Sequence, residues 1–291
     1  MAFKIAVASG KGGTGKTTVS LNLFDNFTKV FSYEVMLVDC DVEEPNAALF
    51  FPDAEKGKAV KVNQEIPVID TVKCTFCRKC VEYCEFNAIL VMPPVGFAEI
   101  DPALCHSCGA CQVACEHDAI RVRDEPIGQL QHYQTENGRG IMEGTLKIGS
   151  AMQTMMIREL KKSLPPNMDI LLFDAPPGTS CPVVETIAGA DYVVLVTEPT
   201  PFGLHDLKLM IKLIRKIEYP FGVVINKANL GTRDLYDYLQ ENNIEILCEI
   251  PFDAEYASQY AKGKLFKDAP VHILDAFSEL AEKLIKTATG Q

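Results

Sequence analysis

A glycine-rich loop near the start of the chain most constrains how the chain folds. The loop has the sequence GKGGTGKT, and it lies between an apolar run at Phe3–Ala8 and a helical pattern near residues 16–30. This spacing satisfies G-x-x-x-x-G-K-[ST], a loop that joins a strand to a helix. The glycines let successive backbone N–H groups point at phosphate oxygens beside the helix N-terminus. The sequence therefore predicts a phosphate-binding loop in an α/β domain.

Outside one cysteine-rich stretch, short apolar runs alternate with amphipathic helical patterns. Strands are expected at Phe3–Ala8, Val35–Asp39, Ile170–Asp174, Tyr192–Thr197, Phe221–Asn226 and Ile244–Ile250. Helices are expected near residues 16–30, 151–162, 203–217, 232–242 and 272–287. Near-continuous apolar strands separated by helices indicate a parallel sheet covered on both faces. We expect a doubly wound, mostly parallel α/β sheet of the P-loop NTPase class.

The cysteines form a second strong pattern. Eight of the 11 lie between residues 74 and 115, where Cys-x2-Cys-x2-Cys-x3-Cys occurs twice, and Cys105 follows Cys74 by 31 residues. We expect this stretch, residues 63–123, to be an inserted small α+β domain, with residues 1–62 and 124–291 forming the ATPase domain. Residues 124–149 show no strong periodicity and are expected to be a connection. Clustered cysteines of this kind indicate a metal site. Zinc is one candidate metal, but zinc sites usually have two pairs of ligands separated by a longer loop.

The insert resembles the bacterial 2[4Fe-4S] ferredoxins, in which the fourth cysteine of each motif ligates the other cluster. By that resemblance one [4Fe-4S] cluster is held by Cys74, Cys77, Cys80 and Cys115, and the other by Cys105, Cys108, Cys111 and Cys84. Glu85 and Glu116 stand where ferredoxins usually have proline. Carboxylates close to the clusters are expected to lower the reduction potentials. His106 and His117 lie beside ligands and are expected to remain outside the coordination shell.

The phosphate loop also fits a dinucleotide-binding pattern, G-x-G-x-x-G, with Asp39 as a ribose-binding acid. That interpretation does not account for Lys16 and Thr17. It also leaves unexplained the segment Asp174–Gly178, which follows a later apolar strand, where an NTPase places its magnesium-side carboxylate. We therefore favour an NTPase in which Lys16 contacts the β- and γ-phosphates and Thr17 binds Mg²⁺.

Lys11 makes the loop KGGTGKT, which resembles the deviant Walker A motif of the MinD/ParA/Mrp ATPases and the nitrogenase iron protein. The resemblance implies a nucleotide-dependent dimer in which Lys11 reaches the partner's nucleotide. It also implies that Asp41 positions the attacking water and that Asp39 supports the magnesium shell. The catalytic residues predicted in this way are Lys11, Lys16, Asp41 and Asp174. The predicted ATP- and Mg²⁺-binding residues are Gly10, Lys11, Gly12, Gly13, Thr14, Gly15, Lys16, Thr17, Thr18, Asp39, Pro177, Gly178, Asn226, Lys227, Pro251 and Asp253, the last four through the adenine.

These features together predict an iron–sulfur P-loop ATPase. We expect ATP hydrolysis in a homodimer, or in a heterodimer with a similar ATPase, to be coupled to electron transfer or metal–sulfur cluster assembly on a partner protein. The alternative is a MinD/ParA-like positioning or scaffold ATPase whose ferredoxin domain senses redox state. A ferredoxin fused to an inactive NTPase fold is a third possibility, and the intact Lys16, Thr17, Asp41 and Asp174 argue against it.

The formal charge of −11 disfavours nucleic acid and anionic lipid surfaces as partners. We expect a cytoplasmic protein, because no export signal is visible and no apolar run reaches 18 residues. Three cysteines remain outside the repeats: Cys40, Cys181 and Cys248. Cys181 follows Asp174 at a spacing similar to that of the cluster-binding cysteine of the nitrogenase iron protein. A cluster shared between subunits needs a second cysteine from each chain, and none is evident.

Overall fold

The computed structural model describes residues 2–135, 140–265 and 269–290, and the chain divides into two units. The larger, the sheet unit, comprises Met1–Ala59, Leu130–Thr145 and Ile157–Gln291. The smaller, the cysteine unit, comprises Val60–Gln129 and Leu146–Met156. The sequence-based insert, residues 63–123, thus lies inside the cysteine unit, which extends a few residues further on both sides and includes a second segment.

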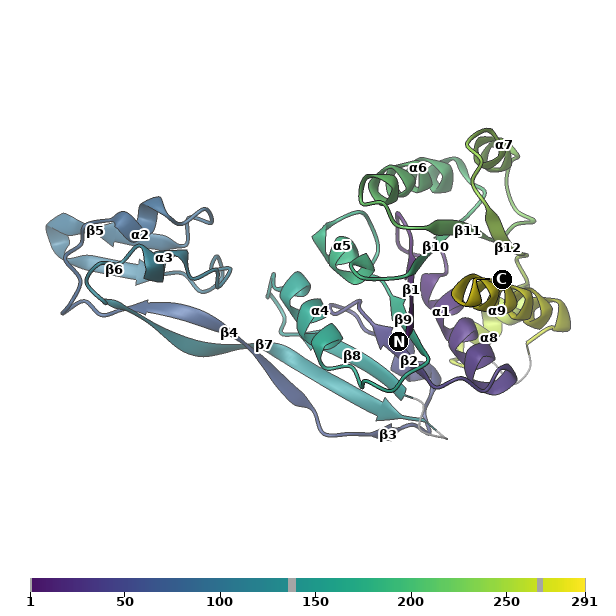
Figure 1. Ribbon diagram of the computed structural model, residues 1–291, viewed down its shortest axis with the longest axis horizontal. Helices are drawn as coiled ribbons and strands as arrows, with labels where there is room; N and C mark the ends of the chain where they lie inside the picture. Colours follow the sequence, from purple (N-terminus) through teal and green to yellow (C-terminus); the bar gives the residue numbers. More distant parts are fainter. Residues whose placement is uncertain (1, 136–139, 266–268, 291) are drawn as a thin grey trace. The chain divides into compact units, whose positions relative to one another are not determined.

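The sheet unit has the mostly parallel α/β sheet that the sequence predicts (Figure 1). Its strand order is β12-β11-β10-β1-β9-β2-β8-β7-β3, and the pairs from β12 to β8 are parallel. The strands are β1 (Phe3–Ala8), β2 (Val35–Asp39), β3 (Glu55–Lys56), β7 (Ile120–Gln134), β8 (Gly140–Leu146), β9 (Ile170–Asp174), β10 (Tyr192–Thr197), β11 (Phe221–Asn226) and β12 (Ile246–Ile250). The six strands expected from the sequence are confirmed, and β12 begins two residues later than expected.

Residues 124–149, expected to be a connection, are more than that: β7 and β8 occupy most of the segment and are strands of the main sheet. Residues 136–139 of that segment lie outside the described residues. β7 lies near the edge of the sheet, and its buried Gln131 side chain donates to the carbonyls of Gly57, at 2.7 Å, and His132, at 2.9 Å. Polar residues whose hydrogen bonds are satisfied in this way break the apolar run that identifies the central strands.

Helices cover both faces of this sheet, as Figure 1 shows, with α1, α8 and α9 on one side and α5 and α6 on the other. Alternate strand residues face opposite sides, so Ile5 and Val7 pack with α1 and α9 in one apolar core. The helices are α1 (Lys16–Asp25), followed by a π-helical turn (Asn26–Val30), α4 (Gln153–Lys162), α5 (Cys181–Ile187), α6 (Pro201–Lys216), α7 (Asp234–Glu241), α8 (Ala254–Ala261) and α9 (Val271–Thr289). Sequence analysis missed α5 and α8, which span only about two turns each.

The C-terminal helix α9 closes the core of the sheet unit. Its side chains Ile273, Phe277, Leu280 and Leu284 are fully buried against the sheet and α1. Among the described helices, none has the length and apolar character needed to cross a membrane.

The cysteine unit contains β4 (Val60–Ile69), α2 (Lys79–Glu82), β5 (Ile89–Met92), β6 (Phe97–Ile100) and α3 (Ala110–Val113). β4 pairs with β7, and β5 pairs antiparallel with β6. The sequence repeat is also a structural repeat. Asp70 N–H donates to the carbonyl of Ala119 at 2.7 Å, and its counterpart Asp101 donates to that of Ala88 at 2.8 Å. The start of each cysteine loop is therefore hydrogen-bonded to the end of the other repeat.

Candidate functional site

The predicted nucleotide residues meet at the carboxyl edge of the parallel strands. The loop after β1 runs into α1, and its Gly15 has φ 96°, a left-handed conformation that glycine tolerates best. A side chain at Gly15 would collide with Asn226, whose amide donates to the carbonyl of Thr14 at 2.8 Å. Gly178 N–H donates to the carbonyl of Ser9 at 3.1 Å, which places the Asp174–Gly178 segment against the loop.

Two carboxyl groups, Asp39 and Asp174, lie side by side at the ends of β2 and β9. Burial raises the pKa of Asp39, and repulsion from Asp174 raises it further, against three backbone N–H bonds from Asp41, Asn46 and Ala47. Burial likewise raises the pKa of Asp174, which accepts bonds from Thr17 and, at 3.0 Å, from Ser20. Such a pair is favoured in its ionised form by a cation, and the hydroxyl of Thr17 adds an oxygen ligand suited to Mg²⁺.

Lys16 lies beside these acids and is almost fully buried. Burial lowers its pKa, whereas the carboxylates of Asp174, Asp41 and Asp39 act in the opposite direction. Asp41 lies just beyond β2 and is half-buried, and burial raises its pKa. The four side chains predicted around the phosphates from the sequence, Lys16, Asp39, Asp41 and Asp174, are thus close enough to interact electrostatically.

Lys11 has an ion-pair partner that sequence analysis did not identify. Its ammonium lies 3.6 Å from Glu198, and Lys227 approaches the same carboxylate at 2.5 Å. Glu198 directly follows β10 and is nearly buried, whereas a third of the Lys11 side chain is exposed. Nothing in the sequence marks Glu198, because it lies far along the chain from Lys11. Within one chain, Lys11 therefore forms a partly exposed ion pair at its own strand edge.

A cavity of about 250 Å³ opens beside the phosphate loop. The residues predicted to hold adenine line this cavity together with the glycine loop: Asn226, Lys227, Pro251 and Asp253. Its wall also contains Phe252, Tyr256 and Tyr260, which sequence analysis missed. Asp253 caps α8 by accepting from Tyr256 N–H at 2.8 Å, and this cap followed by two tyrosines four residues apart was the available signal.

Thr14 offers a direct test of whether the loop suits a phosphate. Within the part of the chain that the structure describes, its hydroxyl is buried and has no hydrogen-bond partner. A buried hydroxyl without a partner is costly, and a phosphate oxygen in the loop is an acceptor that satisfies it. The loop therefore fits a phosphate group.

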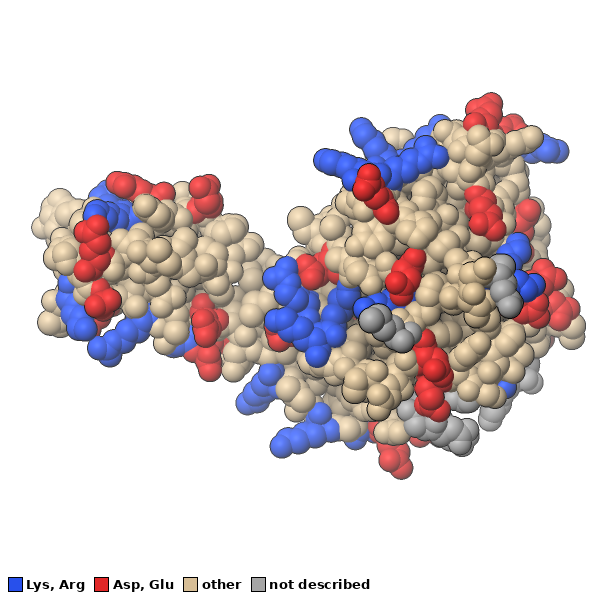
Figure 2. Space-filling model, viewed as in Figure 1, with Lys and Arg blue, Asp and Glu red and all other residues tan. Residues whose placement is uncertain are grey.

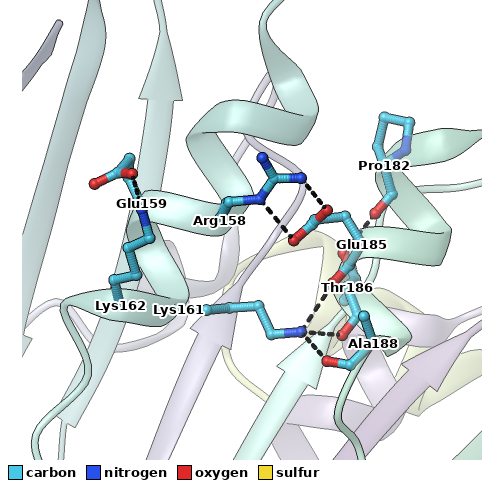
Figure 3. Close-up of polar contacts among 8 residues, drawn as sticks. All are labelled: Arg158, Glu159, Lys161, Lys162, Pro182, Glu185, Thr186 and Ala188. Carbon is cyan, nitrogen blue, oxygen red and sulfur yellow. Dashed lines mark hydrogen bonds and ion pairs between the residues drawn. The ribbon is translucent and has the colours of Figure 1, made fainter. Parts of the chain in front are cut away.

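Helix α5, which follows the Asp174–Gly178 segment, is fixed at its far end by α4 (Figure 3). Lys161 donates to the carbonyls of Glu185, Thr186 and Ala188 at 2.8, 2.9 and 2.6 Å. Arg158 forms a two-pronged contact with the Glu185 carboxylate at 3.3 and 2.9 Å. A cation at the carboxyl end of a helix stabilises its unpaired carbonyl groups. These contacts give the segment before α5 a firm anchor.

We expect Lys161→Met to lower the free energy of unfolding by about 2 kcal/mol, because three carbonyls lose a charged donor. The matched control is Lys162→Met. Lys162 forms an ion pair with Glu159 at 2.7 Å and is exposed, so its loss is expected to cost less than about 0.5 kcal/mol. Urea unfolding followed by circular dichroism measures both values. Equal effects of the two substitutions would contradict this role of Lys161.

The eight clustered cysteines line two separate cavities of the cysteine unit. Each cavity is lined by three cysteines of one repeat and by the fourth cysteine of the other repeat. Cys84 joins Cys105, Cys108 and Cys111 around the first cavity. Cys115 joins Cys74, Cys77 and Cys80 around the second cavity. We call these the Cys84 site and the Cys74 site. The structure brings together the same two sets of four that the ferredoxin resemblance implies.

The backbone around these cysteines donates hydrogen bonds to sulfur. N–H groups point at the sulfurs of Cys74, Cys84 and Cys105, each at 3.4 Å. Left-handed residues at matching repeat positions shape the loops: Phe76 and Ser107, Arg78 and Gly109, Asn87 and Asp118. Such bonds favour thiolates, the form that binds iron. Among the described residues, no group of three or more acidic, histidine or cysteine side chains is close enough to hold a single metal ion.

The three remaining cysteines have different surroundings. Cys40 is fully buried between Asp39 and Asp41, and burial raises the pKa of its thiol. Cys248 lies in β12 within the core. Cys181 is exposed at the start of α5.

Comparisons with known proteins agree with this geometry. A sequence model of the family described as "CobQ/CobB/MinD/ParA nucleotide binding domain" matches residues 5–266. An uncharacterised protein of Methanocaldococcus jannaschii is 35% identical over 264 residues, which cover 90% of each chain. An iron-sulfur cluster carrier protein of Pyrococcus horikoshii is 24% identical over 303 residues, covering 97% of this chain and 85% of that one. The structure of the septum site-determining protein MinD complexed with Mg-ADP, also from Pyrococcus horikoshii, is similar with a TM-score of 0.61 and 19% identity, and the match covers 99% and 98% of the two chains.

Proposed function

Because the chain belongs to the CobQ/CobB/MinD/ParA nucleotide-binding family, we propose that it is a dimeric, Mg²⁺-dependent ATPase that carries two [4Fe-4S] clusters. Its nucleotide state controls electron transfer to a partner protein or metal–sulfur cluster assembly on it. One observation carries the proposal. The same chain has a phosphate loop with the carboxyl groups of Asp39 and Asp174 beside it, and two cavities that are each lined by four cysteines.

The residues at the strand edge suit ATP hydrolysis. The loop N–H groups and Lys16 bind the β- and γ-phosphates, while Thr17 and Asp174 hold Mg²⁺. When bound, Mg²⁺ neutralises charge on the phosphate oxygens. Asp41, just beyond the end of β2, orients the attacking water, and Asp39 holds the following loop through the N–H groups of Asn46 and Ala47. Lys11 from the partner chain stabilises the charge that develops on the transferred phosphate.

The cavity beside the loop suits the adenine base. Asn226 and Asp253 provide polar groups at its wall, and Phe252, Tyr256 and Tyr260 provide aromatic surface. The MinD structure with Mg-ADP supports an adenine nucleotide as the ligand of this fold.

The two cysteine sites suit cubane clusters better than a single metal ion. Each has four thiols spread around one cavity, with N–H groups donating to sulfur. When bound, the clusters supply one-electron transfer. The similarity to an iron-sulfur cluster carrier protein supports the assembly version of the function, and the ferredoxin-like pattern supports the electron-transfer version.

Chain connectivity gives a route for coupling. The segment after β2 contains Asp41 and is held by Asp39, and it leads through the short helix Ala47–Phe50 and β3 into the cysteine unit. Phosphate contacts order such segments in nucleotide switches, and hydrolysis releases them. A change in the conformation of the segment around Asp41 is therefore transmitted along the chain to the start of the cysteine unit.

The rival function, positioning on DNA or a membrane, has one feature in its favour. Figure 2 shows basic side chains gathered over α6, whose Lys208, Lys212, Arg215 and Lys216 are at least partly exposed. Its other requirement, an amphipathic terminal helix available to lipid, is not met by α9, whose apolar face is buried. Basic residues on one helix of an acidic chain do not outweigh the two cysteine sites, so we favour the cluster-coupled ATPase.

Metal and activity measurements on one preparation test the proposed function. The chain, purified without oxygen, is expected to contain about eight iron and about eight acid-labile sulfide atoms per chain, as two cubanes require. It is also expected to hydrolyse ATP only when Mg²⁺ is present. Zinc in place of iron would contradict the cluster proposal, and iron-loaded protein without ATP hydrolysis would contradict the ATPase proposal.

A further inference from the structure

We propose that the two cluster sites are electrochemically unequal, and that Lys73, Arg78 and Lys79 make the Cys74 site the first to be reduced. The inference rests on the proposed function, since it needs clusters in both cysteine sites. The internal repeat supplies a counterpart at each position 31 residues along the chain and so lets the two sites be compared directly.

The first repeat carries three cations where the second carries none. Lys73, Arg78 and Lys79 correspond to Leu104, Gly109 and Ala110. These positions adjoin the cysteines, and two of them also line the cavities. Arg78 and Lys79 are in the wall of the Cys74 site, and Gly109 and Ala110 are in the wall of the Cys84 site.

The glutamates that follow the fourth cysteines are also unequal. Glu116 follows Cys115 and so belongs to the Cys74 site, where it forms an ion pair with Lys79 at 2.5 Å. Glu85 follows Cys84, and the counterpart of Lys79 in that site is Ala110. The expectation that both glutamates act alike is therefore revised, because the carboxylate of Glu116 faces a cation that the Cys84 site lacks at the matching position.

Aromatic rings separate the two sites further. Phe86 and His106 stack at the wall of the Cys84 site, with ring centroids 3.8 Å apart and planes inclined by 15°. Their counterparts in the repeat are His117 and Thr75, which offer no such ring pair. The cysteines differ in burial as well: Cys105 and Cys111 are buried, whereas their counterparts Cys74 and Cys80 are only partly buried, and low solvent exposure disfavours an additional negative charge.

All three differences act in the same direction. Reduction of a cubane adds one negative charge, which nearby cations stabilise and nearby carboxylates oppose. Water and salt weaken each contribution, since Lys73 and Arg78 are exposed. The cations, the glutamates and the burial of the cysteines nevertheless each favour reduction at the Cys74 site over the Cys84 site. A single electron placed on the chain accordingly resides at the Cys74 site.

A redox titration followed by EPR on the full, iron-loaded chain tests the inference. We expect two one-electron steps whose equilibrium constants differ at least about tenfold, which corresponds to about 59 mV for one electron. The triple substitution Lys73→Leu, Arg78→Gly and Lys79→Ala gives the first repeat the residues of the second. It is expected to lower the higher potential and leave the lower one in place. Arg78 has φ 68°, so glycine fits there without strain.

A reciprocal variant keeps the test decisive if the triple variant loses its cluster. Ala110→Lys places a cation at the Cys84 site and is expected to raise only the lower potential. Equal potentials in the unsubstituted chain would overturn the inference, as would an Ala110→Lys variant in which the higher potential moves instead. Protein that holds fewer than two clusters would instead contradict the proposed function, so the two failures are distinguishable by iron content.

Discussion

Replacing Lys11 with alanine is expected to lower the rate constant of ATP hydrolysis about a thousandfold, the lower end of the effect of an arginine finger supplied by a partner. ATP binding is expected to remain nearly unchanged. In one chain the Lys11 ammonium lies 3.6 Å from Glu198, and the side chain is partly exposed, so this ion pair is weak enough to exchange. Comparing kcat with the dissociation constant for ATP separates a loss of catalysis from a loss of binding.

A mixing experiment shows on which chain Lys11 acts. The Lys11→Ala chain keeps an intact Lys16, and a Lys16→Ala chain keeps an intact Lys11. Neither is expected to hydrolyse ATP alone, but a mixed dimer contains one site with Lys16 from one chain and Lys11 from the other. Activity that returns on mixing supports action across the dimer. Activity that stays absent on mixing, or a Lys11→Ala chain with full activity, would contradict it. Lys212→Ala, an exposed change on α6, is the control for loss of surface charge.

Removing the fourth cysteine of a repeat is expected to remove the cluster of the other repeat. Cys115→Ala should strip iron from the Cys74 site and retain the Cys84 site, and Cys84→Ala should do the reverse. Iron is expected to fall from about eight to about four per chain in both variants, because each lost cubane holds about four irons. The two variants should then show the two different potentials, one each.

Cys181→Ala is the matched control for the cysteine substitutions, since Cys181 is an exposed thiol outside both sites. Its iron content is expected to equal that of the unsubstituted chain. The fourth cysteine of each repeat is proposed to bind the cluster of the other repeat. This would be wrong if Cys115→Ala removed the cluster of its own repeat, so that Cys115→Ala showed the higher potential and Cys84→Ala the lower one. Loss of both clusters in both variants is checked by circular dichroism, which distinguishes unfolding of the cysteine unit from selective loss.

Much of the sheet could be predicted because its central strands are buried on both faces. Nearly all residues are apolar in the five strands β1, β2, β9, β10 and β11. Each of these strands ends at or just before a residue of the candidate nucleotide site. β7 and β8 could not be predicted in the same way. Their polar side chains, such as Gln131 and Glu143, are satisfied by tertiary hydrogen bonds that no local pattern reveals.

The site shows the same division between local and tertiary information. The phosphate loop, Asp39, Asp41, Asp174 and the eight cysteines follow fixed spacings, and spacing is visible in a sequence. Glu198 and Tyr256 become part of the site only through folding, since each is far along the chain from the loop it serves. The compensation of Glu116 by Lys79 is likewise tertiary, because 37 residues separate the two side chains.

Control of the clusters by nucleotide state is tested most directly by one measurement. The iron-loaded chain is reduced, and its EPR spectrum and both potentials are recorded without nucleotide, with ADP, and with a non-hydrolysable ATP analogue. We predict that the ATP analogue changes the spectrum or shifts the potential of at least one cluster relative to the other two states. Identical spectra and potentials in all three states, in protein with about eight irons that hydrolyses ATP, would contradict coupling between the two units.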